Sequence, residues 1–145
     1  MRWIIAVGLL GFAATSLAND VGQIKVMAGT VHLERDGKRL PAEVGMPVRQ
    51  SDSLVTGSDG TAGVTFTDNS LLSVGPNSAL AIDRYAFDST THAGQFDASL
   101  KKGTLAVISG KIVKQSPGAM RVHTPTSIMG VRGTEFAVKV SEGGN

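Results

Sequence analysis

Alternation of apolar and polar side chains is the feature that most constrains this chain. In residues 61–67, TAGVTFT, the side chains of Ala62, Val64 and Phe66 fall on one side of an extended chain and the threonines on the other. The same period of two recurs in residues 23–27, 30–35, 95–100 and 134–140. Such a period places one face of a strand against a core and the other face toward solvent. No stretch keeps a helical period over three turns, so the sequence predicts strands rather than helices.

Turn residues separate these segments. Asp36-Gly37 lies between two alternating runs, which is the strongest short-range signal for a β-hairpin. Asp68-Asn69 similarly turns the chain from residues 61–67 into residues 70–74. We therefore predict an all-β fold, a compact antiparallel sandwich or roll of many short strands. A short β-solenoid is the alternative, because periodicity does not distinguish these architectures.

Two segments are expected to supply much of the core. Residues 103–109 form an almost continuous apolar run, which predicts a strand buried on both faces. The last strand, residues 134–140, is expected to direct Phe136, Val138 and Val140 inward.

Residues 1–18 have the plan of a secretory signal peptide. Met1-Arg2 supplies a basic start, residues 3–17 are apolar apart from Thr15 and Ser16, and Ala18 ends a small-x-small cleavage pattern. We expect cleavage after Ala18. An uncleaved membrane anchor is the alternative, but the apolar run is shorter than the roughly 20 residues that span a bilayer.

Charge and cysteine content narrow the function. Without Arg2, 13 of the 14 basic side chains remain against 12 acidic ones, and no basic stripe is visible, so a nucleic-acid partner is not expected. There is no cysteine, which excludes disulfides, thiol catalysis and a lipid-anchored amino-terminal cysteine. The remaining length suits one domain, placed at residues 22–140 and followed by a polar tail at 141–145. A periplasmic location fits these features best, and full secretion is compatible with them.

The titratable residues do not form a recognisable catalytic pattern. His32, His92 and His123 lack the spacing of metal ligands, and surface positions are expected for them. The aspartates fall mostly in predicted turns, where Asp accepts hydrogen bonds from the backbone; they are Asp52, Asp59, Asp68, Asp83, Asp88 and Asp97. A nucleophile elbow and a phosphate loop are both missing from the sequence. We therefore expect a protein that is not an enzyme and that has no cofactor and no metal site.

Aromatic residues give little support for sugar binding. Tyr85, Phe87 and Phe96 are too few and too scattered for a stacking platform, although two of them could line a groove.

The most specific stretch is residues 123–136, HTPTSIMGVRGTEF. Pro125 imposes an extended or turn conformation on Thr124, and Gly130 and Gly133 allow a bulge or a close backbone approach. The glycine spacing is not that of a phosphate loop. We interpret the stretch as a structural bend leading into the last strand; its motif residues are Thr124, Pro125, Gly130, Arg132, Gly133, Thr134 and Phe136.

Arg132 stands between the two glycines of this bend. Its guanidinium can form two parallel hydrogen bonds with a carboxylate. We expect it to clamp the bend by pairing with Glu135 or with one of the turn aspartates. An anionic ligand or a partner protein is the alternative.

Several motifs, taken in order, resemble the FecR domain, a periplasmic module named after an iron-transport regulator. They are Gly22-Gln-Ile-Lys-Val26, Gly29-Thr-Val31, Gly45, Asp52-Ser-Leu-Val-Thr-Gly57, Val64-Thr-Phe-Thr-Asp68 with Ser70 and Leu72, Ser78 with Leu80 and Ile82, Gly103-Thr-Leu105, Val122-His-Thr-Pro125 and Gly130-Val-Arg-Gly-Thr-Glu-Phe136. The resemblance runs from about Gly22 to Val140, and the final motif is the most diagnostic.

The resemblance implies an all-β envelope module without an established catalytic role. In regulators of the FecR type, the module follows a cytoplasmic anti-sigma region and one membrane helix, and it relays occupancy of an outer-membrane transporter to a sigma factor. This chain lacks that cytoplasmic region before its apolar stretch, so direct control of a sigma factor is not expected. We expect an envelope sensing or protein-interaction module whose partner is another envelope protein. A cell-wall or polysaccharide-binding module, with a glycan or peptidoglycan as ligand, is the alternative.

Overall fold

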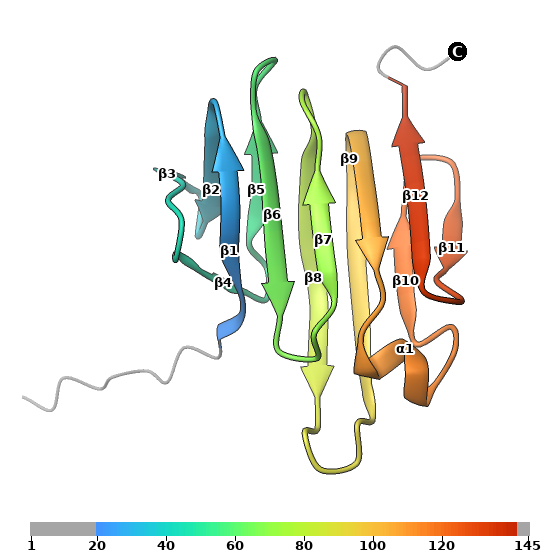
Figure 1. The fold of residues 1–145 in the computed structure, drawn as a ribbon. Coiled ribbons are helices and arrows are strands. Elements are labelled where there is room, and N and C mark those ends of the chain that lie inside the picture. The colour runs from blue at the N-terminus through green and yellow to red at the C-terminus, as the bar shows by residue number, and fades with distance from the viewer. Residues whose placement is uncertain (1–19, 142–145) are drawn as a thin grey trace, which may run out of the picture.

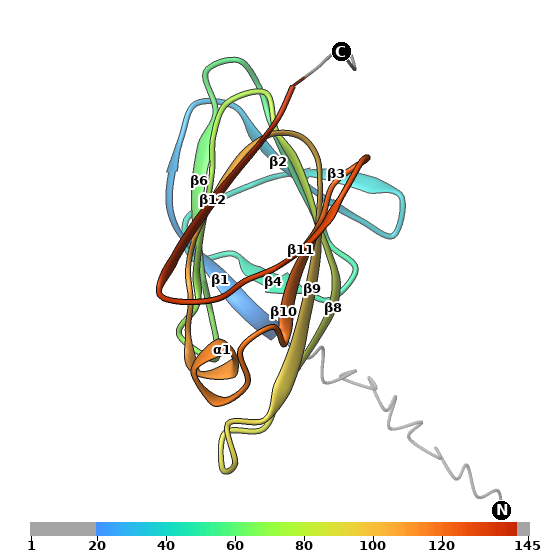
Figure 2. The ribbon, with the colours of Figure 1, turned by 90° about the vertical axis from the view of Figure 1, so that its right-hand side faces the viewer.

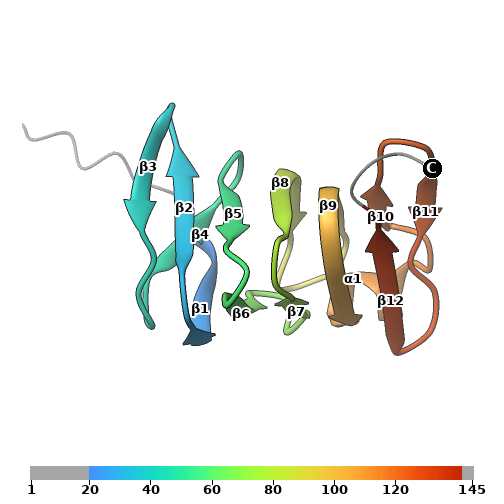
Figure 3. The same cartoon turned by 90° about the horizontal axis from the view of Figure 1, so that it is seen from above.

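A computed structural model describes residues 20–141, which form two facing layers of β-strands and one short helix, α1 (Lys111–Gln115) (Figures 1 and 3). The strands are β1 (Asp20–Ala28), β2 (Val31–Arg35), β3 (Lys38–Pro41), β4 (Pro47–Arg49), β5 (Ser53–Thr56), β6 (Thr61–Phe66), β7 (Leu71–Val74), β8 (Ala79–Phe87), β9 (Gly94–Ile108), β10 (Met120–His123), β11 (Ile128–Gly130) and β12 (Glu135–Val140). The predicted signal peptide and residues 142–145 of the polar tail lie outside the described residues.

The strand order confirms the predicted all-β fold class. The front layer has the order β4-β1-β6-β7-β9-β12, and the back layer has the order β3-β2-β5-β8-β9-β10-β11. Pairing is antiparallel except between β9 and β10. Because β9 belongs to both layers, the whole is one curled sheet that folds partly around its own core, which corresponds to the predicted roll (Figure 2).

Both predicted hairpin turns are present. Asp36 and Gly37 have φ values of 53° and 74°, and they join β2 to β3 as a two-residue turn with φ positive at both positions. Asn69, with φ of 70°, turns β6 into β7. Local turn chemistry therefore determined these connections.

Strand β9 differs from its prediction in two ways. The segments 95–100 and 103–109 are not separate strands but one long strand, which bends at Gly103 with φ of 93° as it passes from the back layer to the front. The prediction of burial on both faces was wrong. Leu105 and Val107 are buried, whereas Ile108 is 43% exposed. The reason is that no further layer of residues 20–141 covers the outer face of the front sheet (Figure 3).

The connections between the layers stack along one rim and are tied together by two hydroxyl groups. Thr56 Oγ1 donates to the carbonyl of Gly75 at 2.6 Å and accepts the N–H of Ser78 at 2.9 Å. Ser78 Oγ donates to the carbonyl of Pro76 and accepts the N–H of Thr104, both at 3.0 Å. These bonds satisfy backbone groups that the corners would otherwise leave unpaired within the fold.

No helix within residues 20–141 is long and apolar enough to cross a membrane.

Candidate functional site

The Thr-Pro motif closes the hairpin between β10 and β11. Thr124 N–H donates to the carbonyl of Ser127 at 2.8 Å, and Thr124 Oγ1 accepts the N–H of Ser127 at 3.0 Å, with Pro125 inside the turn. Gly130 ends β11, and the following Val131 is fully buried. This half of the motif is a hairpin anchored by one apolar side chain.

Arg132 does not clamp the bend. Its side chain is exposed and makes no hydrogen bond or ion pair with any residue that the structure describes, so the expected internal partner was wrong. Ser109 takes that role instead. Its Oγ lies 2.5 Å from the carbonyl of Gly133, and its N–H donates to the carbonyl of Thr134 at 2.8 Å. The prediction overlooked Ser109 because a lone serine after an apolar run carries no local signal of such a contact.

Phe136 lies on β12, next to the bend. Phe136, Val138 and Val140 pack against the core as predicted, but they are only partly buried because β12 is an edge strand.

The histidines are not brought together. His32 lies on β2, His92 in the β8–β9 hairpin and His123 at the end of β10, all half-buried. Within residues 20–141 there is no group of three His, Cys, Asp or Glu side chains placed to hold a metal ion. His92 stacks on Phe87 with ring centroids 6.1 Å apart.

Some aspartates serve turns, and others do not. Asp88 accepts the N–H groups of Thr90 and Thr91, which lowers the pKa of its carboxyl group. Asp83 and Asp97, in contrast, lie within β8 and β9 rather than in turns.

Asp68 is fully buried at the junction of the β6–β7 turn and α1. Its carboxylate accepts the Oγ–H of Ser70 at 2.7 Å, the N–H of Ser70 at 3.0 Å and the N–H of Ile112 at 3.3 Å. Tyr85 Oη donates to the same carboxylate at 3.3 Å and accepts the backbone N–H of Asp68 at 3.0 Å. This cluster joins three elements and is enclosed by them, so it stabilises the fold rather than offering a site for a ligand.

Two of the three aromatic side chains considered for sugar binding are in the core. The ring centroids of Phe96 and Tyr85 are 4.9 Å apart, and the ring centroids of Phe66 and Phe96 are 4.6 Å apart. Burial raises the pKa of Tyr85 to about 12. Neither Tyr85 nor Phe96 is available to stack on a sugar ring, since both are buried.

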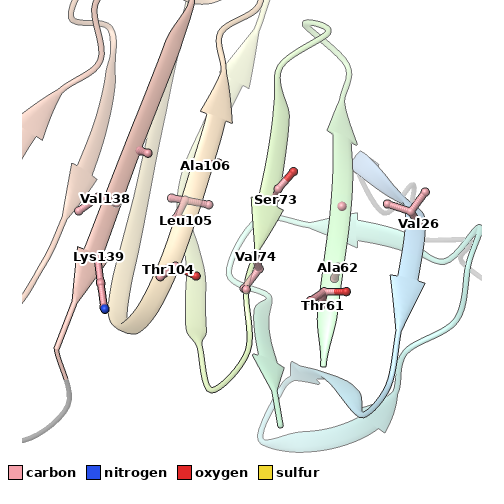
Figure 4. Close-up of a pocket in the computed structure, with 13 residues that line it drawn as sticks. Val26, Thr61, Ala62, Ser73, Val74, Thr104, Leu105, Ala106, Val138 and Lys139 are labelled. Atoms are coloured by element: carbon pink, nitrogen blue, oxygen red, sulfur yellow. The ribbon is translucent and has the colours of Figure 1, made fainter. Parts of the chain in front are cut away.

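The clearest surface feature is a groove of ≈ 590 Å³ across the outer face of the front sheet (Figure 4). One row of directly paired residues runs along it through five neighbouring strands. The row is Val26, Gly63, Ser73, Ala106 and Ala137. Because all but the first of these side chains are small, the sheet surface is low along this row.

Longer side chains stand on both sides of this row. They are Leu71, Ile108 and Glu135 on one side, and Thr61, Thr104 and Lys139 on the other. A smaller hollow of ≈ 370 Å³ over residues 106–108 and 135–137 adjoins the groove. The lining is mainly apolar, and Lys139 is the only charged residue among those that line the larger groove.

Glycines make this face possible. A Cβ atom on Gly63 would lie 2.6 Å from Cγ2 of Val26, whose side chain covers that glycine. A Cβ atom on Gly75 would overlap the hydroxyl of Thr104. Gly63 in β6 and Gly75 just after β7 thus leave room for neighbouring side chains to cover the sheet.

A family model described as FecR protein matches residues 52–145, more than half of the chain. The chain belongs to the FecR family. No curated protein and no solved structure matches it. The FecR family is associated with signal transduction, is regulatory rather than known for enzymatic activity, and is typically associated with the cell envelope.

The FecR match begins at Asp52, whereas the resemblance was expected to begin near Gly22. Strands β1 to β4 precede the matched region, and two of them are hydrogen-bonded to it, since β1 pairs with β6 and β2 pairs with β5. The groove consequently contains one strand from outside the match and four from within it.

Proposed function

We propose that this protein is a non-catalytic module of the bacterial envelope that senses or transmits a signal by binding an apolar segment of another envelope protein. The observation that carries the proposal is the open groove on the outer face of the front sheet. The groove is mainly apolar and crosses five strands. The chain that carries it belongs to a family associated with signalling.

The composition of the groove favours a polypeptide partner. Ser73, Ala106 and Ala137 are exposed and small, which keeps the surface low, so the backbone of a bound segment could approach closely. Exposed apolar patches of this kind mark interaction surfaces in soluble domains. Among the residues that line the groove, only Lys139 has a titratable side chain, which supports binding rather than catalysis.

The periplasmic location rests on the predicted signal peptide and on the family's association with the envelope. Expression of the whole chain in a bacterium, followed by mass spectrometry of the periplasmic fraction, tests it. A mature chain beginning at Asn19 is expected. Recovery only of a membrane-bound chain that retains residues 1–18 would favour the uncleaved anchor.

The binding proposal is tested by affinity capture from envelope extracts with two matched variants. Ala106→Arg places a long charged side chain in the middle of the groove. Ala86→Arg makes the same change at an exposed position of β8, in the other layer. We expect a protein that is captured by the wild type and by Ala86→Arg and lost with Ala106→Arg. Capture of nothing above background, or equal capture by both variants, would contradict the proposal.

The alternative of a cell-wall or polysaccharide-binding module has less support. None of the described residues that line the groove is aromatic, and Tyr85 and Phe96 are buried. Sedimentation with purified peptidoglycan separates the two functions, because only a cell-wall module would be found in the pellet.

A further inference from the structure

The curled sheet has four free edges within residues 20–141, formed by β3, β4, β11 and β12. Unpaired strand edges invite association with other chains, and proteins usually protect them by short length, proline or charged side chains, lysine especially. Three of the edges have such protection. Strand β4 has three residues and begins with Pro47, β11 has three residues and ends with Gly130, and β3 carries Lys38, Arg39 and Pro41.

Strand β12 is less protected than these three edges. It is the longest free edge, with six residues, and contains neither proline nor glycine. Its two charged residues, Glu135 and Lys139, have opposite signs. Neither side chain makes a hydrogen bond or an ion pair with residues 20–141.

The pairing with β9 determines which backbone groups of β12 face the free edge. Ser109 N–H donates to the carbonyl of Thr134, so Thr134 belongs to a hydrogen-bonded pair. Hydrogen-bonded and non-bonded pairs alternate along an antiparallel ladder. The N–H and C=O groups of Glu135, Ala137 and Lys139 therefore point away from β9, toward the free edge.

We propose that β12 pairs with β12 of a second copy of this chain, antiparallel and with Ala137 on the two-fold axis. In this register the three outward-facing residues form the hydrogen-bonded pairs. Ala137 lies opposite the partner's Ala137, and Glu135 lies opposite the partner's Lys139. The two-fold axis repeats that ion pair, so the edge is complementary to itself in charge.

The inner face of β12 is complementary as well. The same register places Phe136 opposite the partner's Val138 on the core side. Both side chains are only partly buried in one chain, and they belong to β12, which lies at the open side of the roll (Figure 2). Pairing would cover them and extend the apolar core across the axis.

A larger surface follows from this pairing. The front sheets of the two copies would form one continuous sheet, and the low row that ends at Ala137 in one copy would continue from Ala137 into the other. The dimer does not depend on the proposed groove partner, since the backbone groups that join the two copies lie on the free edge of β12.

The test compares the mass of the purified protein in solution with that of charge variants, by analytical ultracentrifugation over a range of concentrations. The wild type should sediment as a concentration-dependent dimer. Glu135→Lys places like charges at both symmetric pairs and should weaken dimerisation about tenfold or more. The double variant Glu135→Lys with Lys139→Glu restores opposite signs and should dimerise again. Glu43→Lys, in an exposed loop, changes the net charge equally and should remain dimeric.

A second measurement does not depend on charge. The chain has no cysteine, so Ala137→Cys introduces a single thiol that can form a disulfide only with another molecule. Thiols on the two-fold axis should cross-link rapidly under mild oxidation, because paired residues of adjacent strands lie within disulfide reach. Ala28→Cys, exposed on β1, is the control and should cross-link slowly. A monomeric wild type at all concentrations, or equal cross-linking of the two variants, would overturn the proposal.

Discussion

Arg35 and Asp52 form a bidentate ion pair, with Nε–Oδ1 and Nη2–Oδ2 distances of 2.9 and 2.6 Å. The carboxylate of Asp52 is 2% exposed and also accepts the N–H of Arg49 at 2.8 Å, while the Arg35 guanidinium donates to the carbonyl of Pro47 at 3.1 Å. The hydrogen bond to Asp52 raises the pKa of Arg35 above its ordinary value. One ion pair thus fixes β2 to β4 and to the turn that leads into β5.

Asp52→Asn should destabilise the protein by about 3 kcal/mol, since it leaves a half-buried guanidinium without its countercharge. Glu34 precedes Arg35 and forms an exposed ion pair with Arg39. Glu34→Gln breaks that pair and should lower the stability by less than about 1 kcal/mol. Urea denaturation followed by circular dichroism measures both. Equal losses would show that burial of the Asp52 pair contributes nothing.

Tyr85 should make stability depend on pH in the alkaline range. Burial raises its pKa to about 12 in the folded state, above the value of about 10 in unfolded chains. The folded state therefore holds this proton more tightly. The resulting stability is fully present below pH 10 and is lost as the pH rises through 12. The denaturant concentration at the unfolding midpoint, measured from neutral pH upward, should decrease between about pH 10 and 12.

Tyr85→Phe is the control for that dependence. It removes the titrating hydroxyl group and should abolish the part of the stability loss between about pH 10 and 12 that this group causes. At neutral pH it should cost about 1–3 kcal/mol, because Thr67 Oγ1 and the N–H of Asp68 lose their hydrogen-bond partner. An unchanged alkaline fall in this variant would assign the effect to another group.

Two glycines with similar backbone angles should respond differently to alanine. Gly103 and Gly118 have φ values of 93° and 89°. A Cβ atom on Gly103 would lie 2.5 Å from Cα of Ser78, whereas nothing lies within 4 Å of one on Gly118. Gly118→Ala should cost about 1–2 kcal/mol from backbone strain alone. Gly103→Ala should cost about 3 kcal/mol or more, since crowding at the corner is added. Thermal or urea unfolding distinguishes these outcomes.

Two neighbouring residues of the Gly-Val-Arg-Gly motif should also differ in their contribution to stability. Val131 is fully buried, so Val131→Ala should cost about 2 kcal/mol in the free energy of unfolding. Arg132 is exposed and unpaired within the described chain, so Arg132→Ala should change it by less than about 0.5 kcal/mol. A large loss of stability in Arg132→Ala would indicate that Arg132 does clamp the bend, contrary to the structure.

The candidate site was much less predictable than the strands that form it. Alternation in residues 61–67 and 134–140 correctly indicated which side chains face the core. The same alternation marked Ala137 as outward-facing, but it did not indicate that Gly63, Ser73, Ala106 and Ala137 would align in one row. That alignment depends on the register between strands far apart in the chain. Period-two patterns contain no information about register across such separations.

What the sequence by itself determined is local: the period of two, the Asp36-Gly37 turn, the all-β class and the motifs of the FecR family. These depend on neighbours within a few residues, where φ preferences and side-chain alternation act directly. Only the tertiary structure decided that β9 crosses both layers, that Ser109 rather than Arg132 holds the bend, and that β12 is left as an open edge. Each of these depends on which distant strands pair and on what remains uncovered afterwards, and that is set by packing the whole chain around one core.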